Sequence, residues 1–453
     1  MKLLETAARL GIRYVDALTE RAVDADPAAV ERLRDAARVP LPEHGEDALR
    51  VLERLDALGS PATVASAGPR YFGFVTGGTL PASLAASWLL DVWDQNAWGS
   101  ASSPVSAILE ETALRWVVSA LGLPDATGGA FVTGATMANF TGLMAARHAV
   151  LAREGWDVER DGLFGAPEVR VVLGEEAHPT VAKSLALLGF GRERVTRVPV
   201  DDQGRMRADA LPDLSGPCIV IAQAGNVNSG AFDPMHAICD RAAEQGAWVH
   251  VDGAFGLWAL AAPGRAGRAA GVERADSWAT DAHKWLNTPY DCGIALVRDA
   301  RALKDSVAFR APYLEMMDAA REPADYSPES SRRARGIEVW AALASLGRDG
   351  LADLVERCCR HAARFAQGLE QAGHAVLNDV CLNQVVVRFG DDATTGRVID
   401  AIQRDGTCWC GPTRWRGQAA MRISVAGWST TGDDVERSLR AILRIADAER
   451  GGA

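Results

Sequence analysis

The sequence predicts an α/β fold with a mainly parallel sheet, closed by a smaller α+β domain. Between residues 71 and 297, short apolar runs rich in β-branched residues alternate with stretches of helical periodicity. Strands that are apolar along their whole length are typical of parallel sheets covered by helices on both faces. The runs expected to form strands are 130–132, 169–173, 218–221, 248–251 and 294–297.

The two ends of the chain differ from this middle part. Residues 1–68 have helical periodicity with one polar face and are expected to form an N-terminal helical arm. The large domain is expected at 69–335 and the small C-terminal domain at 336–453. The apolar face of the arm is too small to make its own core. We therefore expect the arm to pack against a second copy of the chain in a homodimer.

Length and charge restrict the class of protein. A chain of 453 residues without a linker is too long for one ordinary core and is expected to form two or three packed domains. The net charge of −11 and the lack of a long Lys/Arg block argue against nucleic acid or an anionic membrane as partner. The expected partner is a small molecule. No stretch resembles a signal peptide or a membrane span, so a cytoplasmic location is expected.

The cysteines predict neither a metal site nor a disulfide framework. They lack the repeated short spacing that either would need, and Cys408 and Cys410 have no nearby His. We expect buried free thiols in a reducing compartment. The eight are Cys218, Cys239, Cys292, Cys358, Cys359, Cys381, Cys408 and Cys410.

Four turns after predicted strands carry residues suited to chemistry. In an open parallel sheet, ligands bind beyond the carboxyl ends of the strands. The first turn contains Gly134, Ala135 and Thr136 at the start of a helix, where backbone N–H groups and a hydroxyl can approach a phosphate. An ordinary helix N-cap is the alternative explanation.

The other three turns each present one ionisable side chain. His178 opens a helix that contains Lys183, and a lone His is more often structural than catalytic. Asp252 ends an apolar strand, so its carboxylate needs a cation or strong hydrogen bonds. Lys284, between His283 and Trp285, is either an ion-pair partner or an amine nucleophile.

Together these turns predict a site for pyridoxal 5'-phosphate (PLP). PLP needs a lysine for its Schiff base, an acid for its pyridinium nitrogen and a helix N-terminus for its phosphate. Lys284, Asp252 and residues 134–136 supply these three elements. The acid keeps the ring nitrogen protonated, which makes the ring an electron sink.

Nearly the whole chain resembles the group II PLP-dependent decarboxylases, the family of aromatic-L-amino-acid decarboxylases. The most specific run is Asp281-Ala-His-Lys-Trp-Leu-Asn-Thr-Pro-Tyr-Asp-Cys-Gly293. The resemblance implies PLP-dependent transferase fold type I, which is the aspartate-aminotransferase fold. The other matching segments are 69–72, 103–104 with Glu110, 128–139, 178–183, 230–234 and 250–252.

The resemblance also implies roles for individual residues. Lys284 forms the internal aldimine and Asp252 pairs with the pyridine nitrogen. His178 stacks on one face of the ring and Ala254 packs on the other. Tyr313, on a mobile loop, returns a proton to Cα after CO2 leaves. The residues implied to hold the phosphate are Ala135, Thr136 and His283 at the turn of Gly134.

Two positions depart from the family. Asn226-Val227-Asn228 stands where many relatives carry consecutive threonines near the ring, so that contact is either rearranged or supplied by Asn226. Asp281 places an acid beside the phosphate site. This acid can be tolerated only if its carboxylate turns toward backbone donors.

The implied reaction is decarboxylation of an L-amino acid to its amine through a quinonoid. The resemblance places the side-chain pocket between subunits, and its aromatic lining suggests an aromatic or bulky substrate, whereas Arg70 nearby would favour an acidic one. The alternatives are a decarboxylating aldehyde synthase, a Cα–Cβ lyase, an aminotransferase, or a binding module without turnover. The expected pocket residues are Tyr71, Phe74, Thr79, Trp93 and Trp98.

Overall fold

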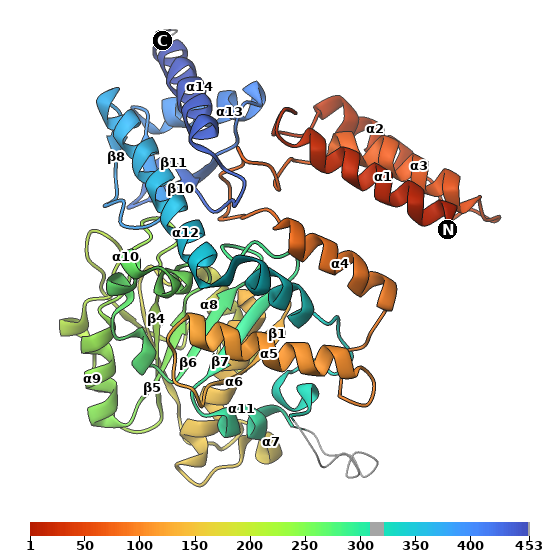
Figure 1. Ribbon diagram of the computed structural model, residues 1–453. Coiled ribbons are helices and arrows are strands. Elements are labelled where there is room, and N and C mark those ends of the chain that lie inside the picture. The colour runs from red at the N-terminus through yellow and green to blue at the C-terminus, as the bar shows by residue number, and fades with distance from the viewer. Residues whose placement is uncertain (309–320, 452–453) are drawn as a thin grey trace. The chain divides into compact units, whose positions relative to one another are not determined.

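The computed structural model describes residues 1–308 and 321–451, which divide into two compact units. The terminal unit joins residues 1–78 with 363–377 and 385–453. The central unit comprises residues 79–362 and 378–384. Figure 1 shows the elements of both units in chain order. The three-part division expected from the sequence stays a prediction.

The central unit is built on a seven-stranded sheet with the order β1-β7-β6-β5-β4-β2-β3. All its strands are mutually parallel except β7, which runs antiparallel to both of its neighbours, β1 and β6. The prediction of a mainly parallel sheet is confirmed, and β3 and β6 are additional to the five expected strands. The strands are β1 (Gly128–Val132), β2 (Arg170–Gly174), β3 (Thr196–Val198), β4 (Cys218–Gln223), β5 (Trp248–Asp252), β6 (Ser277–Asp281) and β7 (Gly293–Val297).

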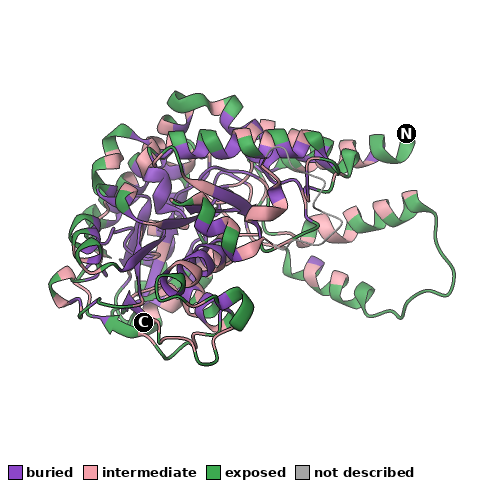
Figure 2. Cartoon of the chain, turned by 90° about the horizontal axis from the view of Figure 1, so that it is seen from below, coloured by how far each residue is buried: buried purple, intermediate pink, exposed green. Residues whose placement is uncertain are grey.

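The middle strands are buried on both faces. Every residue of β4, β5, β6 and β7 is buried, and Figure 2 shows these strands in purple. Helix α6 (Ala135–Ala152) packs on β5, β6 and β7. A Cβ at Gly142 would lie 2.7 Å from the ring of His250, so glycine permits this close approach of helix and strand. The helix that begins at the candidate phosphate turn is thus held firmly against the sheet.

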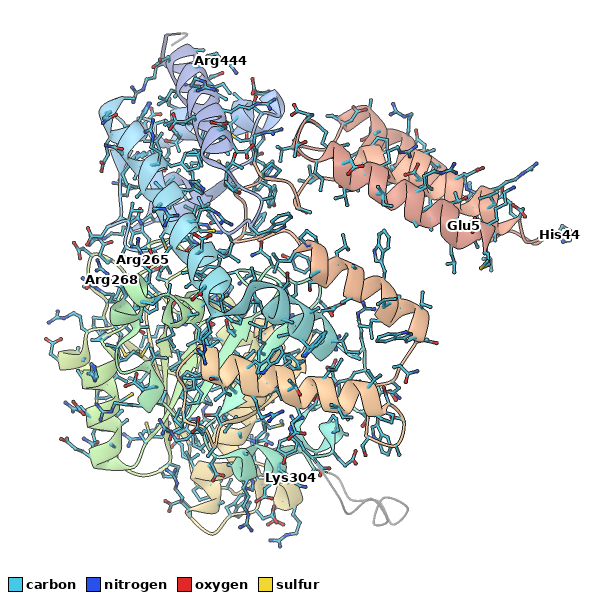
Figure 3. All side chains as sticks on the ribbon, viewed as in Figure 1. Glu5, His44, Arg265, Arg268, Lys304 and Arg444 are labelled. Atoms are coloured by element: carbon cyan, nitrogen blue, oxygen red, sulfur yellow. The ribbon has the colours of Figure 1, made fainter. Side chains whose placement is uncertain are left out.

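Side chains cap several helices of the central unit. Ser103 accepts a hydrogen bond from the backbone of Ser106 at the start of α5, and Asp299 accepts one from Arg301 at the start of α11. Lys304 of α11, labelled in Figure 3, pairs with Asp325 at 2.6 Å. The remaining helices are α4 (Pro81–Trp93), α5 (Pro104–Ala120), α7 (Val158–Asp161), α8 (Pro179–Leu187), α9 (Met235–Gln245), α10 (Pro263–Ala266), α11 (Ala300–Val307) and α12 (Gly336–Gln371), which breaks at Gly347 and continues into the terminal unit.

The terminal unit combines the first helices of the chain with a four-stranded sheet of order β10-β11-β9-β8. This sheet confirms the α+β character expected for the C-terminal part. Arg444 of α14, labelled in Figure 3, pairs with Asp405 at the end of α13 at 2.6 Å. The elements are α1 (Lys2–Ala17), α2 (Pro27–Ala37), α3 (Ala48–Ala62), β8 (Ala375–Val376), β9 (Gln384–Arg388), α13 (Asp392–Asp405), β10 (Gly411–Trp415), β11 (Gln418–Ser424) and α14 (Gly432–Gly451).

Arg70 has a structural place in the terminal unit. Its side chain is 2% exposed, and Nε donates to the carbonyl of Thr407 at 2.7 Å. Its Nη atoms donate to the carbonyls of Thr19 and Arg21, and Asp434 lies 3.7 Å away. Burial lowers the pKa of this guanidinium. Each nitrogen of the guanidinium already donates to a backbone oxygen, and this arrangement argues against the suggestion that Arg70 reads an acidic substrate.

Several helices expose apolar side chains to solvent. Leu4 and Ile12 of α1 are 64% and 53% exposed, Leu55 of α3 is 65% exposed, and Val92 of α4 is 67% exposed. Among residues 1–308 and 321–451, no helix combines the length and the apolar character needed to cross a membrane. These exposed side chains lie on α1, α3 and α4.

Candidate active site

The four turns identified in the sequence lie at one edge of the central sheet. Strands β1, β2, β5 and β6 are parallel to one another, since β1 and β6 both pair antiparallel with β7. Their carboxyl ends therefore point the same way. These ends carry Gly134, His178, Asp252 and the segment 281–284, respectively.

Lys284 forms an ion pair with Asp281. Its Nζ lies 3.2 Å from Asp281 Oδ2, and the lysine side chain is 22% exposed. The other carboxylate oxygen, Oδ1, accepts a hydrogen bond from the backbone N–H of Ala135 at 2.5 Å. The carboxylate of Asp281 thus faces a backbone donor, which is the condition under which an acid can be tolerated beside the expected phosphate site. One carboxylate connects the end of β6, the lysine amine and the start of α6.

Asp252 is a buried carboxylate, and few neighbouring groups offset its loss of hydration. The residue is 5% exposed, and its Oδ1 accepts a hydrogen bond from Ala254 N at 3.2 Å. Burial raises the pKa of Asp252, while the charges of His178 and Lys284 act in the opposite direction. A cationic N–H donor beside this carboxylate would compensate its desolvation, and a pyridinium nitrogen is such a donor.

Both histidines of the candidate site accept a hydrogen bond at Nδ1. His283 Nδ1 accepts a hydrogen bond from Cys292 N at 3.1 Å, and burial lowers the pKa of the imidazole, which leaves a neutral ring with its hydrogen on Nε2. His178 Nδ1 accepts from Thr180 N at 3.3 Å and lies 2.7 Å from Thr180 Oγ1. Its Nε2 therefore also carries a hydrogen. The ring of His283 stacks on Tyr290 with 4.3 Å between centroids.

The start of α6 has room for an anion. A Cβ at Gly134 would lie 3.3 Å from His283 Cε1 and 3.5 Å from Asp281 Oδ1, so glycine keeps this space open. The N–H groups of the first helical turn have no partner within the helix. Thr136 is half-buried, and its carbonyl accepts a hydrogen bond from Ser184 Oγ at 3.0 Å. A phosphate group suits this surrounding of amides, hydroxyl and imidazole.

Asn226 stabilises the turn after β4 with its side-chain oxygen. Oδ1 accepts hydrogen bonds from Asn228 N at 2.9 Å and from Ser229 N at 3.2 Å. Its Nδ2 is buried without a hydrogen-bond partner in the part of the chain that the structure describes. The departure from the family's threonines therefore leaves one spare donor. Ala254 lies on the neighbouring turn, and its carbonyl accepts a hydrogen bond from Asp281 N at 2.8 Å.

The expected substrate residues are distributed over both units. In the terminal unit, Tyr71 stacks on Trp409 at 5.0 Å, and Phe74, which is 60% exposed, lies 5.5 Å from the same ring. In the central unit, Trp93 is 42% exposed, while Thr79 and Trp98 are half-buried. Tyr313 lies outside the described residues.

Sequence reasoning did not single out three residues that contact expected site residues within their own units. Thr180 holds the ring of His178, Tyr290 stacks on His283, and Trp409 joins Tyr71 and Phe74. A hydroxyl two residues after a helix-opening histidine is the signal that identifies Thr180. Trp409 carries no such local signal, because it lies more than 300 positions along the chain from its partners.

The residues present fit PLP. They offer an amine, a buried carboxylate and an open helix N-terminus at one sheet edge, together with a spare buried donor on Asn226. Across residues 1–308 and 321–451, no group of three or more His, Cys, Asp or Glu side chains is arranged to hold a metal ion.

Comparisons with known proteins agree with this fit. The family model of the pyridoxal-dependent decarboxylase conserved domain matches residues 30–389. L-2,4-diaminobutyrate decarboxylase of Rhizobium meliloti strain 1021 is 33% identical over 377 residues, which cover 79% of this chain and 72% of that protein. Aromatic-L-amino-acid decarboxylase of Bacillus atrophaeus is 29% identical over 329 residues, which cover 70% of this chain and 66% of that protein.

Solved structures share the fold. The Oryza sativa protein TDC, crystallised with PLP and tryptamine, has a TM-score of 0.90 at 23% identity, with 99% of this chain and 97% of that chain covered. Mouse CSAD has a TM-score of 0.88 at 23% identity, with 98% and 99% covered. The fold expected from the sequence, PLP-dependent transferase fold type I, is confirmed. The chain belongs to the pyridoxal-dependent decarboxylases, a family of carboxy-lyases whose cofactor is PLP.

Proposed function

We propose that this protein removes the α-carboxylate of an aromatic or bulky L-amino acid and releases the amine and CO2. The observation that carries the proposal is the arrangement of Lys284, Asp252 and His178 at parallel strand ends in a chain of this family. The chemistry that bound PLP supplies is an electron sink for the pair left on Cα when the bond to the carboxylate breaks.

The proposed roles follow from the position of each side chain. Lys284 Nζ would hold the cofactor through its amine and would yield that place to the substrate amine, because its side chain reaches the site from the end of β6. Asp252 holds a proton at the pyridine nitrogen, and that cation compensates the buried carboxylate. His178 would hold the ring of the cofactor from one side and Ala254 from the other.

Other residues are proposed to hold the phosphate and to return a proton to Cα. Ala135, Thr136 and His283 Nε2 are proposed to hold the phosphate, with Gly134 leaving the space. Tyr313 is proposed to return the proton to Cα. With PLP bound, the residues that hold the substrate carboxylate would select which bond to Cα breaks, because orientation decides the reaction.

The substrate proposal combines the relatives with two local observations. The relatives act on different side chains, since their names include L-2,4-diaminobutyrate, aromatic amino acids and acidic amino acids. In this chain Arg70 is occupied by backbone carbonyls, which removes one candidate reader of an acidic side chain. Phe74 lies exposed beside Trp409 and offers aromatic surface. These observations favour an aromatic or bulky side chain.

A homodimer with shared active sites is part of the proposal. Helices α1, α3 and α4 expose apolar side chains of 53% to 67% exposed fraction at Leu4, Ile12, Leu55 and Val92. Apolar faces of this kind are stabilised when a symmetric partner covers them.

A substrate screen tests the function. Purified protein loaded with PLP is incubated with each of the twenty amino acids, and CO2 and amines are measured by mass spectrometry. Equal amounts of amine and CO2 from an aromatic or bulky substrate support the proposal. Aldehyde with ammonia identifies an aldehyde synthase, a keto acid identifies an aminotransferase, and cleavage of the side chain identifies a lyase. Protein that takes up no PLP contradicts the proposal entirely.

A further inference from the structure

We propose that Asp281 is an internal anion of the cofactor site, which competes with the phosphate of PLP for the start of α6 and with its aldehyde for Lys284. Asp281 thereby limits how tightly PLP is held. This inference rests on the cofactor site of the proposed function and concerns affinity for the cofactor instead of the reaction catalysed.

One carboxylate engages the groups that the cofactor needs. Asp281 Oδ1 accepts the hydrogen bond of Ala135 N at 2.5 Å and lies 3.6 Å from His283 Nε2. Asp281 Oδ2 lies 3.2 Å from Lys284 Nζ. The amide and the imidazole are proposed phosphate donors, and the amine is the proposed attachment point. Any anion arriving at this turn therefore meets a carboxylate that already accepts from the amide, pairs with the amine and lies close to the imidazole.

The backbone of Asp281 cannot retreat from this position. Its N–H donates to the carbonyl of Ala254 at 2.8 Å, and its carbonyl accepts the indole N–H of Trp258 at 3.0 Å. The residue also forms the last pair of β6 with Gly293 of β7. Only rotation of the side chain can move the carboxylate, and rotation gives up a charge-assisted hydrogen bond and an ion pair.

Burial makes this competition strong. The side chain of Asp281 is 3% exposed, so little water screens its charge. A phosphate dianion at the first turn of α6 would face this carboxylate at close range, and like charges at short distance in a low dielectric repel. Removal of the charge should therefore tighten phosphate binding, even when a neutral side chain of the same shape still accepts the hydrogen bond.

The variant Asp281→Asn tests this prediction, because asparagine retains an oxygen that can accept from Ala135 N but has no charge. Three probes are titrated into the cofactor-free protein: PLP, pyridoxal, which has the aldehyde without the phosphate, and inorganic phosphate. We expect PLP to bind at least about ten-fold tighter than to the unmodified protein, and inorganic phosphate to bind tighter as well. Pyridoxal should gain less than PLP.

Asp291→Asn is the matched control. Asp291 accepts a hydrogen bond from Arg335 Nε at 2.8 Å, and its charge also acts on His283. No contact joins its side chain to Ala135 or Lys284 among the contacts of the described residues. This control removes the same charge close by, and we expect it to leave the affinities for PLP and inorganic phosphate within about two-fold. Circular dichroism verifies folding, and Asp281→Ser repeats the test with a smaller neutral side chain.

Three outcomes overturn the inference. Weaker binding of PLP and phosphate to both Asp281 variants would make the carboxylate a holding residue. Equal gains in affinity for PLP and pyridoxal, with no gain for inorganic phosphate, would show that Asp281 competes only for Lys284 and not for the phosphate position. An equal gain in affinity for PLP and inorganic phosphate in Asp291→Asn would show that the total negative charge around the site, and not the contacts of Asp281, limits binding. The phosphate titration needs no turnover, so a failure of the proposed reaction is a separate result.

Discussion

His250 Nε2 lies 2.8 Å from Asn139 Oδ1, and this contact joins β5 to α6. Both residues are fully buried. On the other side of the ring, Nδ1 lies 2.8 Å from Ser277 Oγ, which accepts the indole N–H of Trp248 at 2.8 Å. His250 precedes Asp252 by two residues on the strand. The chain of hydrogen bonds therefore links the strand of the candidate carboxylate to the helix of the candidate phosphate turn.

Protonation of His250 should destabilise the fold. Burial lowers the pKa of His250 to about 3, below the ordinary value near 6.5. Between these values the unfolded chain binds a proton that the folded chain does not, so this contribution to stability is complete above about pH 6.5 and is lost as the pH falls. Relative to His250→Gln, the unmodified protein should lose on the order of 2 kcal/mol between pH 7 and pH 5. Denaturant unfolding at the two pH values measures this difference, and identical pH dependence in both proteins would contradict a neutral His250.

Lys284→Ala should abolish both turnover and the covalent link to PLP, because Lys284 is the amine at the carboxyl end of β6. Borohydride reduction followed by peptide mapping locates the linked residue. Lys183→Ala is the control, since Lys183 is exposed on α8 and should keep activity and label. A label on Lys183 in the unmodified protein would overturn the site assignment.

Asp252→Asn should keep PLP through the phosphate contacts but lower kcat by about 10²- to 10³-fold, since the amide cannot hold the ring nitrogen in its charged form. Activity per bound PLP measures the effect. Asp233→Asn is a control for the loss of a buried carboxylate. Asp233 accepts hydrogen bonds from Met206 N and Gln223 N, and burial raises its pKa to about 6. Asp233→Asn should change the free energy of unfolding and leave kcat per bound PLP unchanged. Normal turnover of Asp252→Asn would remove Asp252 from the mechanism.

Tyr313→Phe should separate CO2 loss from proton return. The substitution keeps the ring and removes the hydroxyl, so CO2 release should continue while protonation of Cα slows. A Cα that has lost CO2 but has not yet been protonated would then react with oxygen and water. Aldehyde, ammonia and peroxide should therefore form at the expense of amine. Oxygen consumption and amine yield are measured together. An unchanged amine yield without oxygen uptake would assign the proton to another group.

Ile12→Asp should weaken the proposed homodimer, because it puts a charge on the exposed apolar face of α1. Sedimentation at assay concentration should show more monomer and less activity than in the unmodified protein. Phe164→Asp is the control, since Phe164 is 98% exposed in the central unit outside these helices. An active monomer of the unmodified protein would refute the shared site.

The sequence by itself determined the type of sheet and the chemistry available at its edge. Run 218–221 is apolar at every position and run 248–251 is apolar except at His250, and this local pattern indicates burial on both faces of a strand. Asp252 ends β5, one of the expected strands, whereas Lys284 follows β6, which the sequence pattern did not reveal. The two strands are neighbouring and parallel, so the general rule for parallel sheets brings both residues to one edge. These properties depend on neighbours in the chain, which a sequence displays directly.

The tertiary structure alone decided which distant groups pair. Asp281 meets Ala135 across 146 positions because β7 lies antiparallel between β1 and β6, and strand order is not encoded in the periodicity of any one strand. The guanidinium of Arg70 is likewise bound by carbonyls as remote as Thr407. Local patterns specify whether a side chain is buried. The atoms that satisfy its charge are set by the folded arrangement of segments far apart in the chain.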